Sequence, residues 1–125
     1  MSDAFIADDV REFILLHIDT VAQMEALLLL REDAGQNWTI REVARRLYVS
    51  DSAAGEVMGR LVSAGLCAHA AESYRYDPGE PERRALIDRV AEAYSSYLIA
   101  VTAIIHDKSA RIQKFADAFR FRRDK

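Results

Sequence analysis

The sequence predicts a mostly α-helical single domain with one short two-stranded β-hairpin. Along most of the chain, apolar residues recur at intervals of three and four, as on the buried face of an amphipathic helix. Over residues 66–76 the interval changes to two, which is the spacing of a strand with one buried face. At 125 residues, 50% of them hydrophobic, the chain suits one core rather than two.

Capping signals divide the first half of the chain into helices. The sharpest is Thr39-Ile40-Arg41-Glu42, a capping box in which the Thr39 hydroxyl and the Glu42 carboxylate each satisfy a free backbone N–H group. A tight connection at Tyr48-Val49 then leads to a helix that ends at Gly65, a favourable residue just past a helix. The helices expected from these signals are 10–16, 20–32, 40–47 and 51–64.

A hairpin and one long helix are expected next. Alternation at 66–70 and 73–76 predicts two strands, and no helix breaker occurs over 81–107. The apolar seam of that helix is too long for a small core to cover, so a partner helix is expected from the N-terminal segment, a second subunit or both. We favour a homodimer through residues 81–107, with help from residues 8–18. The predicted dimerisation residues are Ile87, Val90, Tyr94, Tyr97, Leu98, Val101 and Ile105.

The order helix, helix, tight turn, helix, hairpin, helix resembles the winged helix-turn-helix domains of bacterial transcription regulators, such as the MarR-like and PadR-like groups. The resemblance covers about residues 20–78. Its most specific parts are Trp38-Thr39, Val43-Ala44-Arg45-Arg46-Leu47, Leu61 and Gly65-Leu66. It implies double-stranded DNA as a partner, the helix from Asp51 as the recognition helix, 66–76 as the wing and 81–107 as a dimerisation helix. The charge of residues 108–125 predicts a basic tail.

Two groups of side chains are candidates for DNA contacts. Phosphates would be held by Arg41, Arg45 and Arg46, with Arg75 as the wing contact. A solvated helix face explains the first three arginines equally well. Base edges would be met by Ser52, Glu56 and Arg60 on the recognition helix, where only the arginine is a strong ligand.

An alternative to DNA binding is a winged-helix adaptor that binds another protein without sequence-specific DNA contacts. Residues 1–35 hold eight acidic and two basic residues, whereas residues 107–125 hold three acidic and seven basic ones. A DNA-binding protein needs a basic field, which the acidic first third does not supply. The adaptor would use that acidic N-terminal face, or Phe115 and Phe119 in the tail.

Several other classes receive little support. The sequence holds none of the motifs of nucleotide-binding loops, serine hydrolases or zinc proteases, so we expect no enzyme and no cofactor. A metal site is not expected, because Cys67 and His69 would need further ligands from His17 or His106. The longest apolar run is 26–30, which predicts no membrane span, and a lone cysteine favours the cytoplasm.

Overall fold

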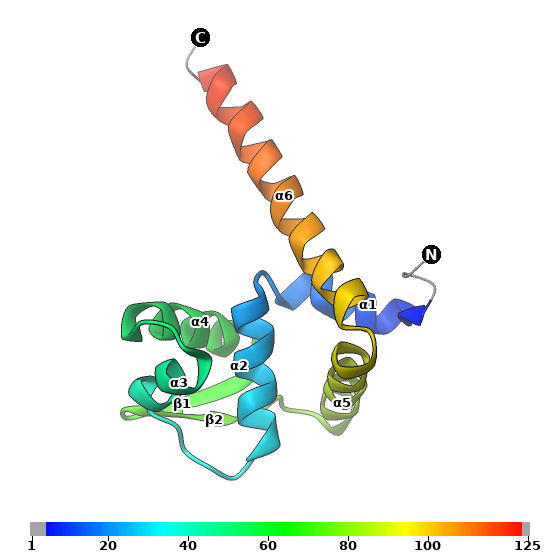
Figure 1. The fold of residues 1–125 in the computed structure, drawn as a ribbon. Helices are drawn as coiled ribbons and strands as arrows, with labels where there is room; N and C mark the ends of the chain where they lie inside the picture. Colours follow the sequence, from blue (N-terminus) through cyan, green and yellow to red (C-terminus); the bar gives the residue numbers. More distant parts are fainter. Residues whose placement is uncertain (1–4, 124–125) are drawn as a thin grey trace.

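The computed structural model describes residues 5–123 of the chain, with side chains up to residue 118. In this part the fold is mostly α, with a two-stranded antiparallel hairpin, as the sequence predicts (Figure 1). The elements are α1 (Asp8–His17), α2 (Val21–Glu32), α3 (Ile40–Leu47), α4 (Asp51–Ser63), β1 (Cys67–Ala70), β2 (Ser73–Tyr76), α5 (Pro81–Ser96) and α6 (Leu98–Arg123).

The core lies around α2. Met24, Leu27 and Leu30 of this helix are fully buried, and α2 packs against α3, α4 and β2. Met58 and Leu61 of α4 are buried in the same cluster. In Figure 1, α3, α4 and the hairpin lie together on one side of α2, while α1 and α5 lie on the other.

Two capping boxes fix the starts of α2 and α3. The Thr39 hydroxyl accepts from the Glu42 N–H at 3.2 Å, and the Glu42 carboxylate accepts from the Thr39 N–H at 2.8 Å, as predicted. Thr20 and Gln23 form the second box, and the Gln23 side chain is buried. Because the Gln23 amide oxygen also accepts from the Asp19 N–H at 2.7 Å, this box fixes the whole connection between α1 and α2.

The hairpin is joined to the helices through Trp38. β1 pairs with β2 in antiparallel register, with Cys67 opposite Tyr76. The backbone N–H of Trp38 donates to the carbonyl of Tyr74 at 2.7 Å, and Tyr74 donates back at 2.7 Å. The segment before α3 therefore extends the sheet by one bridge, which fixes the position of α3 relative to the wing.

The predicted single helix over 81–107 is wrong. Tyr97 has non-helical torsion angles (φ −133°, ψ 52°), and the chain turns there from α5 into α6. Neighbouring Ser95 and Ser96 are poor helix formers, so the break costs little. Because of the turn, α5 and α6 pack against each other and both contact α1.

The same turn changes the predicted dimer seam. Four of its residues, Ile87, Val90, Val101 and Ile105, are fully buried in the core of the single chain, so they form no surface for a second copy. The reason is that α1, α5 and α6 cover one another's apolar faces. Of the other three, Tyr94 is half-buried and donates to the carboxylate of Glu25, while Tyr97 and Leu98 are exposed. Residues 108–123 of the predicted basic tail form the distal part of α6.

No single helix in the described part is long and apolar enough to cross a membrane. Only α1 and α2 taken together pass that test, and they are bent by 109° relative to each other.

Candidate nucleic-acid interface

The arginines of α3 form an exposed basic surface. Arg41, Arg45 and Arg46 are all exposed, and within the described residues none of them forms an ion pair. The Arg46 guanidinium lies over the Trp38 ring, 5.6 Å from its centre, which leaves its edge open to solvent. The sequence placed these three residues on the outer face of α3, and the structure agrees.

Other arginines are used differently. Arg31 is paired with Asp88 at 2.9 Å, and Arg89 holds Asp9 through two hydrogen bonds. Arg83 donates to the carbonyl of Ala64 at 3.0 Å. Their charges are neutralised or used inside the fold, whereas those on α3 are available for an external anion.

The N-terminal half of α4 exposes few side chains that could contact a DNA base. Ser50 caps the helix by accepting from the Ala53 N–H at 3.0 Å, and Ser52 and Glu56 are exposed beyond it. A Cβ added at Gly55 or Gly59 would meet nothing within 4 Å, so the face of α4 is shallow there. Two of the three predicted base-contacting side chains are thus accessible, and one of them is acidic.

The third, Arg60, is held by an ion pair. One carboxylate oxygen of Asp19 lies 3.1 Å from the Arg60 guanidinium, and the other lies 2.7 Å from the ammonium of Lys108 on α6. Arg60 also lies near the end of α4, whereas a recognition helix reads bases with its N-terminal residues. In this conformation Arg60 therefore does not extend freely from α4.

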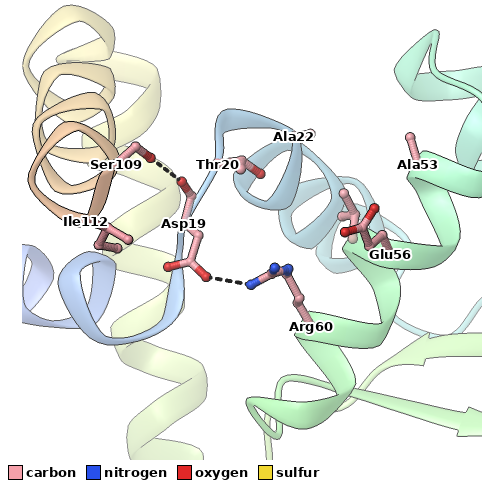
Figure 2. A pocket seen from close by; sticks show the side chains of 9 residues that line it. Asp19, Thr20, Ala22, Ala53, Glu56, Arg60, Ser109 and Ile112 are labelled. Carbon is pink, nitrogen blue, oxygen red and sulfur yellow. Dashed lines mark hydrogen bonds and ion pairs between the residues drawn. The ribbon is translucent and has the colours of Figure 1, made fainter. Parts of the chain in front are cut away.

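A groove separates α4 from α6 (Figure 2). Its volume is about 440 Å³, and the chain between α1 and α2 closes one end. α6 is fixed beside it because Ser109 donates to the carbonyl of Asp19 at 3.0 Å and Lys108 to the carbonyl of Ile18 at 3.1 Å. The lining residues are Asp19, Thr20, Ala22, Ala53, Glu56, Val57, Arg60, Ser109 and Ile112.

The wing presents one basic side chain. Arg75 on β2 is exposed and lies opposite Ala68 in the hairpin register. The rings of His69 and Tyr74 stack with centres 4.1 Å apart and stiffen the strand pair beside it. The turn itself contains Ala71, at φ 56°, and the acidic Glu72, so it carries no cation for a minor groove.

Two titratable side chains in this part of the fold have shifted pKa values. Hydrogen bonds from Thr39 lower the pKa of Glu42, so the cap stays ionised beside the arginines. Burial raises the pKa of the Cys67 thiol to about 12, which makes it an unreactive core residue. Among the described residues no group of histidine, cysteine and carboxylate side chains could hold a metal ion.

Sequence reasoning missed Asp19 as the residue that connects α4 with α6. Its partners lie 41 and about 90 positions away in the chain, and no local pattern encodes such a contact. For the alternative adaptor surface, Phe115 is 72% exposed, whereas the side chain of Phe119 lies outside the described residues.

Comparisons with protein-family models, with curated proteins and with solved structures found no match.

Proposed function

We propose that this chain is a winged-helix protein that binds double-stranded DNA and regulates transcription in the bacterial cytoplasm. The observation that carries the proposal is the exposed set Arg41, Arg45, Arg46 and Arg75, which form no ion pair within the described residues. Guanidinium groups that are free of carboxylates are suited to phosphate oxygens. Three of them lie on α3, directly beside the helix that would enter the major groove.

The proposed mode of binding depends mostly on phosphate contacts. Ser52 and Glu56 are the accessible side chains toward base edges, and the usual base partner of a glutamate is the N4 amino group of cytosine. Arg60 joins them only when its ion pair with Asp19 opens. We therefore expect modest discrimination between DNA sequences and a strong dependence of affinity on salt.

A salt titration of binding to random-sequence duplex DNA, starting near 50 mM salt, tests the proposal. Each phosphate contact that is lost should reduce the slope of log affinity against log salt by about 0.9. The variant Arg41→Ala/Arg45→Ala should therefore show a slope smaller by about 2 units. Arg84→Ala/Arg89→Ala on α5 is the control for charge, because it removes the same number of arginines from the opposite side of the body. It also breaks the pair between Arg89 and Asp9, so an unchanged melting temperature must first establish that this variant folds.

A protein-interaction role is the second candidate, favoured by the exposed apolar side chains Ile112 and Phe115 on α6. Absence of DNA binding at low salt, where electrostatic attraction is strongest, would overturn the first proposal and leave this one. An equal loss of slope in the α3 and α5 variants would remove α3 from the interface.

A further inference from the structure

Tyr48, in the turn between α3 and α4, is an aromatic residue that the fold itself does not use. Its side chain is 94% exposed. Within the described residues this side chain lies outside the hydrophobic core and has no hydrogen bond and no ring contact. A tyrosine in a folded protein commonly buries much of its ring and places its hydroxyl against a polar partner. Here both the ring and the hydroxyl face solvent.

The backbone also disfavours tyrosine at this position. Residue 48 ends α3 in the left-handed region, at φ 60° and ψ 44°, and its N–H donates to the carbonyl of Ala44. Glycine is the usual residue for that conformation, because a Cβ is unfavourable there. The end of α4 follows this rule, with Gly65 at φ 76°. Neither packing nor backbone geometry therefore explains a tyrosine at residue 48, and strain of this kind is concentrated at functional positions.

Tyr48 continues the basic face of α3. Positions 41, 45 and 48 are separated by four and three residues, which is the spacing of one side of a helix. Arg41 and Arg45 are exposed on that side and form no ion pair within the described part of the chain. Beyond the turn, the exposed Ser52 begins the face of α4 that would meet bases. Tyr48 therefore lies between the candidate phosphate contacts and the candidate base contacts.

We propose that Tyr48 is a further DNA contact, whose hydroxyl donates a hydrogen bond to a backbone phosphate beside the one that Arg45 holds. This contact rests on the proposed function. Tyrosine hydroxyls are among the groups that position proteins on the phosphate backbone of DNA. Residues 41 and 48 are about 10 Å apart along the axis of α3, so they would reach different phosphates. The DNA strand would then run along α3 and cross the turn, which directs the start of α4 toward the major groove.

The contact differs in kind from those of the arginines. A phenol is neutral, so its hydrogen bond to a phosphate adds affinity without releasing a bound counterion. Loss of the hydroxyl should therefore lower the affinity by the same factor at every salt concentration. Loss of an arginine contact changes the slope of log affinity against log salt as well. A substitution at residue 48 that acted only by displacing Arg45 would also change this slope.

Titrations with random-sequence duplex DNA at several salt concentrations test the contact. We expect Tyr48→Phe to weaken binding about 3- to 10-fold and to keep the salt slope of the wild type. Tyr48→Gly removes the ring as well, so it should weaken binding at least as much although it relieves the backbone strain. Melting temperatures no lower than that of the wild type establish that both variants fold.

Tyr97→Phe is the matched control. It removes the hydroxyl of another exposed tyrosine, which lies between α5 and α6, on the other side of α2 from α3 (Figure 1). This variant should bind DNA as the wild type does.

The outcomes separate this contact from the proposed function. If the wild type binds DNA and Tyr48→Phe binds equally well, the phosphate contact is wrong and the proposed function stands. If Tyr48→Phe weakens binding and also flattens the salt dependence, residue 48 acts through the arginines, which overturns the contact too. If the wild type does not bind DNA at about 50 mM salt, the proposed function fails and the contact fails with it.

Discussion

Asp19 connects two helices, because its carboxylate pairs with Arg60 of α4 and with Lys108 of α6. We expect Asp19→Asn to lower the free energy of unfolding by about 1–2 kcal/mol, because it leaves the largely enclosed Lys108 with only the Ile18 carbonyl. Asp88→Asn is the control. It breaks a more exposed pair with Arg31, so it should cost less than about 1 kcal/mol. Urea denaturation measures both, and equal costs would mean that Asp19 does not connect the helices.

His17 should make stability depend on pH. Burial, followed by the charges of Arg83 and Lys108, lowers its pKa below the ordinary 6.5, and its ring also lies against Phe13. In the window between the two pKa values the unfolded chain binds more protons than the folded one, so stability falls as pH drops from about 6.5.

The expected result is that the unfolding midpoint in urea decreases from pH 7 toward pH 5, and that His17→Leu reduces this decrease. His69 lies on the exposed wing, so His69→Leu should leave the decrease unchanged. The same pH profile in wild type and His17→Leu would contradict the prediction.

At the scale of the element, the turn between α3 and α4 holds backbone strain. Tyr48 ends α3 in the left-handed region, at φ 60° and ψ 44°, and its side chain is 94% exposed. A residue with a Cβ is disfavoured there by roughly 1 kcal/mol, whereas glycine is not. Tyr48→Gly should therefore raise the free energy of unfolding by about 0.5–1 kcal/mol. Tyr48→Ala keeps the Cβ and should change it little, so a stabilisation by alanine alone would rule out strain as the cause.

The elements differ in how far the sequence determines them. Thr39 and Glu42 predict the start of α3 from sequence, because both partners of each hydrogen bond lie within one helical turn. The break at Tyr97 has no such local signal: neither glycine nor proline is present, and the gain comes from packing α6 on α1, some 90 residues earlier in the chain. An apolar seam read along one straight helix therefore predicted an intermolecular surface where the chain buries the same residues itself.

At the scale of the whole molecule, the residues of the candidate site also differ in how far the sequence determines their positions. The exposed positions of Arg41, Arg45 and Arg46 follow from helix periodicity, so sequence could predict them. The pairing of Arg60 with Asp19 depends on how α4 meets the α1–α2 connection, which no local pattern reveals. The exposed arginines of α3 were therefore easier to locate from sequence than the residues of α4 that we propose to contact bases.

The two halves of α6 contribute unequally to folding. Val101, Ile104 and Ile105 are buried, and the last hydrogen bonds from α6 to the body come from Lys108 and Ser109 within the described part of the chain. Residues 110–118 are exposed. A chain that ends at residue 110 should therefore keep its free energy of unfolding within about 0.5 kcal/mol.

A chain that ends at residue 100 should not fold, because it loses three buried side chains worth about 1.5–3 kcal/mol each, which is comparable to the whole stability of a small domain. Circular dichroism during urea denaturation measures both truncations. If ending the chain at residue 110 also abolished folding, the distal half of α6 would have to stabilise the monomer itself.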